Sequence, residues 1–292
     1  MRLRTLPLSV AGVLLGLMLA CADYQVPVSV IVLTVTTAVF LQILSNVSNE
    51  LGDALSGTDG DLRQGPDYPL MQGKLSVRDF KTMIWIYAVC SCVSGLILVR
   101  VSFGTFFSLE SLMLIILGAM AISSAMRYTL GSSPYGYKGL GDLYVFLFFG
   151  LVSVLGSYFV AAHTVKTWLL FLPAVSIGTF SMGVLNVNNM RDMNTDAATR
   201  KTIPVRIGLH KAKIYQTILI LCGWSAMVLY SAFRFFDPFH YLFLLSLPLF
   251  LVHLLQVWKS EGSKLDRALP LLSISTLLFS ILSGLGYLIY LF

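Results

Sequence analysis

Long apolar stretches alternate with shorter polar connections along the whole chain. Nine of these stretches are long enough to cross about 30 Å of hydrocarbon at about 1.5 Å per residue. They are predicted at residues 6–22, 27–47, 80–100, 108–128, 142–162, 167–187, 213–233, 239–258 and 268–291. The two-residue alternation of a membrane barrel is absent, so we expect an all-α polytopic membrane bundle of about nine transmembrane helices, with residues 1–292 forming a single integral-membrane domain.

Composition favours a membrane protein over a soluble one. The chain draws 57% of its residues from the hydrophobic set and only 12% are charged, whereas an ordinary soluble domain is roughly 25% charged. The first apolar stretch leads directly into a second, longer one, so we do not expect it to be a cleaved secretory signal. All four cysteines lie within apolar stretches, which predicts neither a disulfide framework nor a zinc site.

The charged residues gather on one side of the predicted bundle. If the N-terminus is cytoplasmic, 17 of the 20 Lys and Arg residues fall on the cytoplasmic side, and only Arg100, Lys166 and Arg234 fall on the other. This bias predicts a cytoplasmic N-terminus and, with nine spans, a C-terminus on the opposite side. Only three of the 14 Asp and Glu residues lie outside, so the inner face concentrates charge of both signs. The net charge of +6 therefore reflects membrane topology, and no nucleic-acid partner is expected.

Two long cytoplasmic connections carry similar polar sequences. Asn49 and Asp53 follow the second span, and Asn188, Asp192 and Asp196 follow the sixth. If each run continues the preceding helix, the four-residue spacing places its polar side chains on one face. Aligning Asn49 with Asn188 and Asp53 with Asp192 gives the same offset of 139 residues, so we expect two related halves that each contribute one acidic motif.

The side chains of these two motifs suit a magnesium-diphosphate site. Carboxylate and amide oxygens without neighbouring His or Cys favour a hard cation, and Mg²⁺ commonly binds one or two carboxylates together with phosphate oxygens. Nearby Lys74, Lys201 and Arg206 have charges that suit diphosphate oxygens. Two alternatives remain: the acids are solvated at helix ends, and the cations are the ordinary positive charge of cytoplasmic loops. Acids brought together for structural reasons alone would need cationic partners, because like charges repel.

A third cytoplasmic loop, residues 127–142, combines glycines with tyrosines. Tyr128, Tyr135 and Tyr137 offer ring faces that stabilise cations. The alternative is a flexible turn with interfacial tyrosines. Asp142, at the beginning of a membrane helix, is a functional candidate because ionisable groups at membrane depth are costly.

With the acidic motifs placed after the second and sixth spans, the sequence resembles the UbiA superfamily of intramembrane aromatic prenyltransferases. That family has a first motif NxxxDxxxD and a second motif DxxxD. Asp192 and Asp196 match the second motif, and Asn49 and Asp53 match the first, whose last acid is shifted by two residues to Asp59. The shifted form resembles the branch that makes menaquinones from 1,4-dihydroxy-2-naphthoate.

Three further segments resemble that branch, namely residues 135–142, residues 188–192 and the N-terminal segment around Arg4. One position departs from the family pattern, because the Gly-Lys pair that follows the second motif is here Arg200-Lys201. The role of Lys201 is therefore less well supported by the resemblance than the roles of the aspartates.

The resemblance implies a reaction, a cofactor and a location. The protein is expected to transfer a polyprenyl group from polyprenyl diphosphate to 1,4-dihydroxy-2-naphthoate, with loss of CO₂ and diphosphate, giving demethylmenaquinone. Mg²⁺ is the implied cofactor, and the lipid bilayer surrounds the prenyl tail. The implied location is the inner (plasma) membrane, as a multi-pass protein whose active site opens toward the cytoplasm. The absence of a recognisable transit peptide favours a bacterial membrane.

The resemblance and the residue types together give a set of expected roles. The expected catalytic residues are Asp53, Asp192 and Asp196. The expected metal ligands are Asn49, Asp53, Asp59, Asn188, Asp192 and Asp196, with Glu50 as a secondary candidate. The expected diphosphate contacts are Lys74, Lys201 and Arg206, and the expected acceptor or carbocation contacts are Arg4, Tyr128, Tyr135, Tyr137 and Asp142.

Two other functions remain open from the sequence. A sister prenyltransferase acting on 4-hydroxybenzoate or a chlorin would carry similar acidic motifs. A secondary transporter also combines intramembrane polar residues with two related halves, but transporters usually place coupling residues near the bilayer midplane. The acids of this chain cluster at one face of the predicted bundle.

Overall fold

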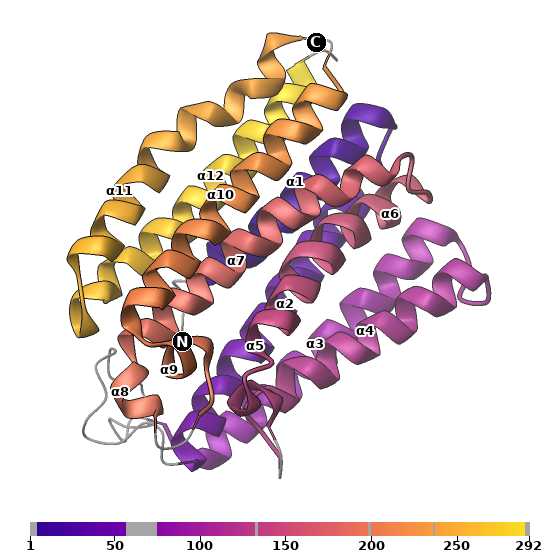
Figure 1. Ribbon diagram of the computed structural model, residues 1–292. Coiled ribbons are helices and arrows are strands. Elements are labelled where there is room, and N and C mark those ends of the chain that lie inside the picture. The colour runs from indigo at the N-terminus through magenta and orange to yellow at the C-terminus, as the bar shows by residue number, and fades with distance from the viewer. Residues whose placement is uncertain (1–4, 57–74, 132–133, 198–199, 236, 290–292) are drawn as a thin grey trace.

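The computed structural model describes residues 5–56, 75–131, 134–197, 200–235 and 237–289. In this part of the chain, nine helical segments are long and apolar enough to cross a membrane, and no strand occurs (Figure 1). The first four are α1(Leu6–Asp23), α2(Val28–Leu55), α3(Val77–Phe103) and α4(Leu109–Arg127). The predicted all-α membrane bundle is therefore confirmed.

The later spans are built from more than one helical piece. The fifth consists of α5(Gly141–Val145), a π-helical segment (Phe146–Gly156) and α6(Ser157–Ala162). The sixth contains α7(Phe171–Arg191), and the short helices α8(Met193–Asp196) and α9(Ile203–Ile207) lead to α10(Leu209–Phe233). The last two spans contain α11(Leu247–Lys259) and α12(Ala268–Leu288), each preceded by a 3₁₀ segment.

The two helices that carry a polar motif extend beyond the apolar stretches that predicted them. The second was predicted to end at residue 47, but α2 continues to Leu55 and includes Asn49 and Asp53. The sixth was predicted to end at residue 187, but α7 continues to Arg191 and includes Asn188. The hydrophobic pattern missed these turns because most of their buried side chains, such as Glu50, Asp53 and Arg191, are polar.

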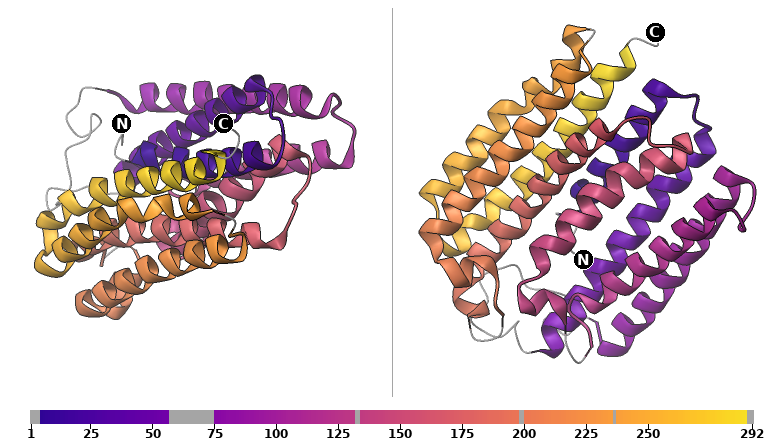
Figure 2. Two further views of the ribbon diagram at one scale, coloured as in Figure 1. Left: turned by 90° about the horizontal axis from the view of Figure 1, so that it is seen from above. Right: turned by 45° about the vertical axis from the view of Figure 1, so that its right-hand side comes forward.

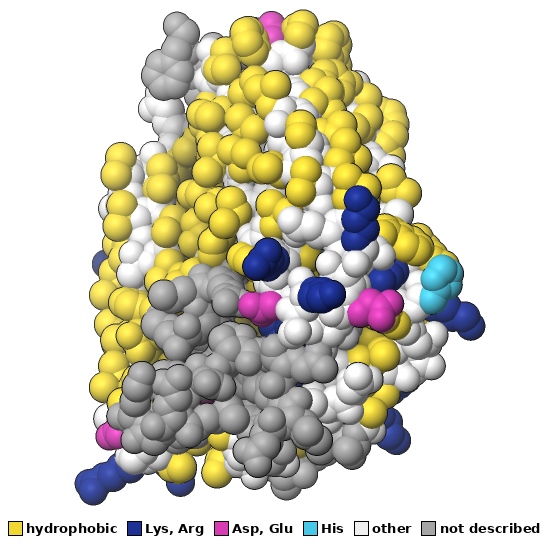
Figure 3. Space-filling model, turned by 90° about the vertical axis from the view of Figure 1, so that its left-hand side faces the viewer, with side chains coloured by type: hydrophobic (Ala, Val, Ile, Leu, Met, Phe, Trp, Pro, Cys, Tyr) yellow, Lys and Arg dark blue, Asp and Glu magenta, His cyan; other side chains and the backbone are white. Residues whose placement is uncertain are grey.

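The helices are arranged so that the motif-bearing α2 and α7 lie in different parts of the bundle and end at the same side. α7 packs against α10 and the fifth span, α1 packs against α12, and α2 packs against α3. α4 lies at the periphery, where Ser111 is its one buried residue (Figures 1 and 2). In the face drawn in Figure 3, hydrophobic side chains cover the upper part, and most of the charged side chains lie below.

A compact ion-pair cluster ties the helices together at the end opposite the motifs. Asp23, at the end of α1, accepts hydrogen bonds from Lys166 Nζ at 2.7 Å, Arg234 Nη2 at 2.9 Å and Tyr158 Oη at 2.8 Å. The two cations neutralise the buried carboxylate of Asp23, and the guanidinium of Arg234 also lies over the rings of Tyr230 and Tyr287. Each of these charges would be costly to bury without a partner. Three of the few charges predicted on this side therefore pair with one another.

Glycines in α1 allow that helix to pack directly on the backbone of the fifth span. A Cβ atom at Gly16 would lie 2.2 Å from the backbone oxygen of Val154 and 2.1 Å from Ser157 Oγ. A Cβ atom at Gly12 would lie 2.8 Å from the backbone oxygen of Phe149. Any larger residue at these positions must push the two helices apart.

We expect Gly16→Val to lower the free energy of unfolding by about 1–3 kcal/mol, the usual cost of overpacking. The matched control is Gly118→Val, because a Cβ atom at Gly118 meets no atom within 4 Å. The thermal unfolding midpoint in detergent should fall for the first variant and stay near that of the wild type for the second. Equal losses in the two variants would show that the packing of α1 does not depend on Gly16.

Candidate active site

A cavity of about 630 Å³ opens between α1, α2, α4, the fifth span and α7. Its polar end contains Asn49 and Asp53 from α2, Asn188 and Arg191 from α7, and Arg200 from the segment before α9. The remaining lining is mainly apolar or hydroxyl-bearing, with the amides of Gln42, Asn46 and Asn189, and continues along α2 as far as Thr34, which is 19 residues before Asp53. At about 1.5 Å per residue this is about 28 Å, close to the thickness of the hydrocarbon core.

The first acidic motif lies on the last turns of α2. Thr129 Oγ1 donates to Asn49 Oδ1 at 3.2 Å, and a Cβ atom at Gly52 would lie 2.5 Å from the Thr129 side chain, so α2 and the loop after α4 are in close contact. Asp53 is only 3% exposed. Its Oδ1 accepts a hydrogen bond from Tyr137 Oη at 3.1 Å and pairs with the guanidinium of Arg200.

The second acidic motif is divided between two arginines. Arg191 donates from Nη2 to Asp192 Oδ2 at 2.6 Å and to Asn188 Oδ1 at 3.0 Å, and from Nη1 to Asp266 Oδ1 at 2.7 Å. Asp196 instead lies with its Oδ1 3.5 Å from Nε of Arg200. The helix does not continue unbroken as predicted, because α7 ends at Arg191 and α8 begins after Asp192.

Arg200 connects the two motifs. Its guanidinium pairs with Asp53 of the first motif and lies near Asp196 of the second, and its Cζ is 4.5 Å from the centroid of the Tyr137 ring. Burial lowers the pKa of Arg200, but the charges of Asp53 and Asp196 outweigh it and hold that pKa above its ordinary value. The two motifs therefore meet around a cation supplied by the chain itself.

Burial also acts on Asp196, which is 3% exposed. It raises the pKa of the Asp196 carboxyl to about 6, Arg200 opposes this rise, and the charges of Asp192 and Asp53 add to it. The Oδ2 atom of Asp196 is buried and has no hydrogen-bond partner among the described residues. A buried carboxylate oxygen without a partner is costly, and a bound cation would remove that cost.

The donor chemistry of the two motifs fits Mg²⁺. Asn49, Asp53, Asn188, Asp192 and Asp196 supply oxygen atoms, the ligand type that Mg²⁺ prefers. Among the residues the structure describes, no three His, Cys, Asp or Glu side chains converge as a ready ligand group. One reason is that carboxylates of the two motifs are paired with Arg191 and Arg200.

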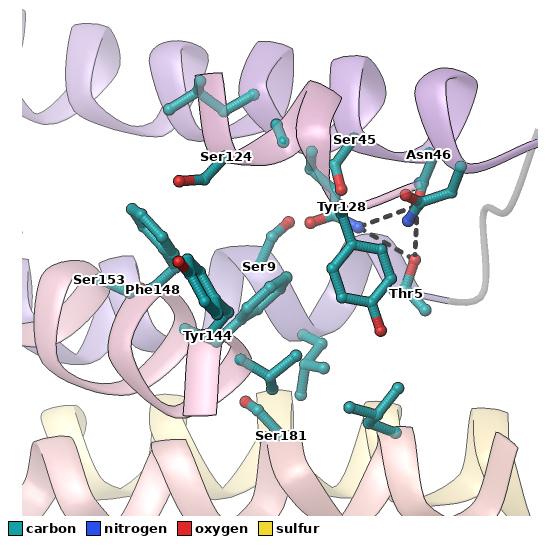
Figure 4. A pocket seen from close by; sticks show the side chains of 18 of the residues that line it. Thr5, Ser9, Ser45, Asn46, Ser124, Tyr128, Tyr144, Phe148, Ser153 and Ser181 are labelled. Atoms are coloured by element: carbon teal, nitrogen blue, oxygen red, sulfur yellow. Dashed lines mark hydrogen bonds between the residues drawn. The ribbon is translucent and has the colours of Figure 1, made fainter. Parts of the chain in front are cut away.

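A row of aromatic rings forms another wall of the cavity. The rings of Tyr135 and Tyr144 are stacked with centroids 3.8 Å apart, Tyr128 meets Tyr135 edge-on at 5.3 Å, and Phe148 lies 6.3 Å from Tyr144. Figure 4 shows the rings of Tyr128, Tyr144 and Phe148 beside the cavity. Burial raises the pKa of Tyr135, so its hydroxyl stays protonated and donates to the backbone oxygen of Ser124 at 2.7 Å.

A hydrogen-bonded polar group forms a further part of the lining. Gln42 Nε2 donates to Thr5 Oγ1 and to Asn46 Oδ1, both at 3.1 Å, and Thr5 Oγ1 lies 3.3 Å from Asn46 Oδ1 (Figure 4). Gln42 and Asn46 precede Asn49 on α2, so the polar face of that helix extends beyond the acidic motif.

The model of the UbiA prenyltransferase family matches residues 9–277. The chain belongs to the UbiA prenyltransferase family. This membership excludes the alternative of a secondary transporter, and it confirms the family resemblance seen in the sequence.

This UbiA family member is similar to two curated bacterial proteins named 1,4-dihydroxy-2-naphthoate octaprenyltransferase. The one from Escherichia coli is 39% identical over 85% of this chain and 80% of its own length. The one from Haemophilus influenzae is 35% identical over 99% of this chain and 94% of its own length. Among solved structures, a UbiA homologue from Archaeoglobus fulgidus bound to DMAPP and Mg²⁺ has a TM-score of 0.61 at 15% identity, over 98% of each chain. That likeness supports the fold.

Arg191 and Arg200 line the cavity, whereas the described basic residues that were predicted from the sequence do not. Lys201 and Arg206 of this UbiA family chain are exposed and do not line the cavity. The backbone N–H of Lys201 donates to the carbonyl oxygen of Tyr137 at 3.0 Å, and Arg206 Nη2 donates to the carbonyl oxygen of Lys138 at 3.1 Å. Both contacts attach the segment around Arg200 to the tyrosine loop.

The other predicted residues fall into two groups. Asp142 is buried and accepts a hydrogen bond from Tyr215 Oη of α10 at 3.1 Å, and Glu50 is buried on α2; neither lines the cavity. The second group consists of the predicted residues Arg4, Asp59 and Lys74, which lie outside the described part of the chain.

Sequence reasoning missed four residues of the cavity lining that the structure brings together. Among the cations near the second motif, Lys201 and Arg206 are the ones predicted to act, and Arg191 and Arg200 receive no role. The spacing did hold a signal, because Arg191 directly precedes Asp192 and Arg200 lies four residues after Asp196. Tyr144 and Phe148 carried a usable signal, because they are four residues apart on the span that begins beside Asp142.

Proposed function

We propose that this UbiA family member transfers a polyprenyl group from polyprenyl diphosphate to 1,4-dihydroxy-2-naphthoate, as the names of its bacterial relatives indicate for those proteins. The observation that carries the proposal is the shape and polarity of the cavity. One end holds Asn49 and Asp53 of the first motif, Asn188 of the second motif and two arginines, and the rest is a mainly apolar space reaching along α2 to Thr34. A charged diphosphate suits the first part and a prenyl tail suits the second.

The diphosphate would bind at the polar end. The residues that would hold Mg²⁺ are Asn49 and Asp53 on α2, Asn188 on α7, and Asp192 and Asp196 just after α7. Asp59 is proposed as a further ligand. When bound, Mg²⁺ neutralises the charge that develops on the leaving diphosphate. Lys74, Lys201 and Arg206 stay candidates for diphosphate contacts from the loops that border this end.

The allylic carbon to oxygen bond then breaks heterolytically, and both electrons leave with the diphosphate. The carbocation that remains needs protection from water and stabilisation of its charge. The rings of Tyr128, Tyr135, Tyr144 and Phe148 border the cavity and can present faces to that charge. Tyr137 is proposed to act nearer the acids, because its hydroxyl donates to Asp53.

The acceptor ring supplies the electrons for the new bond. The ring carbon that carries the carboxylate attacks the allylic cation, and the electrons of the bond to the carboxylate return to the ring as CO₂ leaves. No electrons are gained or lost overall, so the direct product is the quinol form of demethylmenaquinone. Arg4 is proposed to border the acceptor, and Asp142 is proposed to act near the acceptor from its buried position outside the cavity lining.

The proposed location follows from the charge distribution of the chain. The side that carries the acidic motifs also carries most of the Lys and Arg residues, which is the usual property of a cytoplasmic face. We therefore place the N-terminus and the opening of the active site at the cytoplasmic side of a bacterial inner membrane. Residues 1–292 would act as a single membrane domain.

The test is a competition between acceptors. Purified protein in lipid receives Mg²⁺, farnesyl diphosphate and equal amounts of 1,4-dihydroxy-2-naphthoate and 4-hydroxybenzoate, and products are identified by mass. We expect a prenylated, decarboxylated naphthalene product that disappears when a chelator is added. Prenylated 4-hydroxybenzoate as the main product would keep the reaction class and overturn the acceptor.

A further inference from the structure

Arg200 lies where the two acidic motifs meet, at the place where the proposed function requires a bound metal. The side chains of Arg200, Asp53 and Asp196 are 12%, 4% and 5% exposed, so all three charges are largely removed from water. Removing one member of such a group leaves a buried charge uncompensated. The two carboxylates therefore need a cation between them whether or not a metal is present.

The pairing that Arg200 provides is incomplete. Arg200 Nε and Asp196 Oδ2 are both buried and have no hydrogen-bond partner among the described residues, although Nε lies 3.5 Å from the other carboxylate oxygen of Asp196. A divalent metal carries twice the charge of a guanidinium and binds oxygen ligands at shorter distances. The two cations would also repel each other at one site.

We propose that Arg200 is a resident counter-ion that a divalent metal displaces from Asp53 and Asp196, and that its freed guanidinium then binds the diphosphate. The inference rests on the proposed function. The planar guanidinium matches phosphate oxygens and remains charged at all relevant pH values. The side chain of Arg200 thus neutralises the acids before the substrate binds, and it neutralises the diphosphate of the substrate afterwards.

The local geometry limits this exchange to a side-chain rotation. The backbone N–H of Lys201 is bonded to the carbonyl oxygen of Tyr137, which anchors the main chain beside Arg200. Tyr137 also donates to Asp53 and lies beneath the guanidinium, so it borders both the present position of Arg200 and the acids it would leave.

Arg191 differs from Arg200 in a way that predicts a fixed position. It is 4% exposed and contacts Asn188, Asp192 and also Asp266, which lies just before α12. Its Nη1 bond to Asp266 does not involve the acidic motifs, so a metal at those motifs leaves that anchor in place. We expect Arg200 alone of the two to move.

The test measures metal binding directly, without turnover. The full-length protein in detergent is titrated with Mn²⁺, and free Mn²⁺ is counted by electron paramagnetic resonance in the absence of diphosphate. For Arg200→Gln we expect the dissociation constant to fall by about tenfold, because the competing cation is gone. Lys211→Gln is the matched control, since Lys211 is an exposed cation at the start of α10 and its loss changes the net charge equally.

A second titration tests the other half of the inference. With saturating Mg²⁺, we expect Arg200→Gln to bind inorganic diphosphate about tenfold more weakly than the wild type, with Lys211→Gln unchanged. Should Arg200→Gln fail to fold, Arg200→Lys is measured in its place, and an increase in Mn²⁺ affinity smaller than tenfold is expected because an ammonium lacks the planar fork.

Unchanged or weaker Mn²⁺ binding in the folded variant overturns the inference, as does unchanged diphosphate binding. These outcomes are separate from failure of the proposed function. Tighter Mn²⁺ binding by Arg200→Gln, together with a wild-type protein that forms no prenylated product, would support the displacement and contradict the prenyl transfer. Product formation by the wild type, together with unchanged Mn²⁺ binding by Arg200→Gln, would support the prenyl transfer and contradict the displacement.

Discussion

Asp53→Asn is expected to lower kcat/KM for prenyl transfer by about 10³-fold, a loss typical of removing a group that stabilises developing charge. Asparagine keeps the shape of the side chain and can still accept the hydrogen bond from Tyr137, but it removes the negative charge that faces Arg200. The proposed metal loses a carboxylate ligand as a result. The measurement is the rate of product formation over a range of Mg²⁺ concentrations.

Glu110→Gln is the matched control, because Glu110 is an exposed acid in the first turn of α4. Its activity should equal that of the wild type. The thermal unfolding midpoint of each variant establishes that the protein is folded. A folded Asp53→Asn variant that kept activity within tenfold of the wild type would remove Asp53 from the metal and diphosphate site.

Thr34→Phe is expected to change which prenyl donor the protein accepts. Thr34 lines the cavity far from Asp53, is 7% exposed, and donates its hydroxyl hydrogen bond to the carbonyl oxygen of Val30 at 2.7 Å. A ring at this position fills the space that a long tail would occupy, whereas a short tail ends before it. We expect kcat/KM to fall by about 10²-fold for octaprenyl diphosphate, because a displaced tail misplaces the reacting carbon.

With geranyl diphosphate, the same variant should keep wild-type activity. Leu112→Phe is the control, because Leu112 is exposed on peripheral α4 and adds a ring outside the cavity. Products from a mixture of the two donors are compared by mass. Equal losses with both donors would mean that Thr34 affects the packing of α2 rather than the space for the tail.

The sequence predicts the architecture well, because membrane spans depend on local hydrophobicity. All nine predicted stretches coincide with helical segments in the described part of the chain. The four-residue spacing of Asn49 and Asp53 also predicts their shared face, since it depends only on the helical repeat. The predicted stripe after the sixth span holds for Asn188 and Asp192, which share Arg191, while Asp196 turns to another partner.

The counter-ions of the site could not be predicted in the same way. Arg200 and Asp53 are 147 positions apart, so their pairing depends on how the sixth span and its following segment pack beside α2. Acids grouped for structural reasons need cationic partners, and in this structure Arg191 and Arg200 are those partners. The aromatic row has the same origin, because Tyr135 and Tyr144 stack only once the loop folds back over the fifth span.

The most direct test of the central claim follows the carboxylate of the acceptor. The purified protein is given Mg²⁺, a polyprenyl diphosphate and 1,4-dihydroxy-2-naphthoate carrying ¹³C in the carboxyl group, and labelled CO₂ and the prenylated product are quantified together. We predict equal amounts of ¹³CO₂, diphosphate and an unlabelled prenylated quinol. A prenylated product that retained the label, or a folded protein that formed no product with this acceptor, would contradict the account.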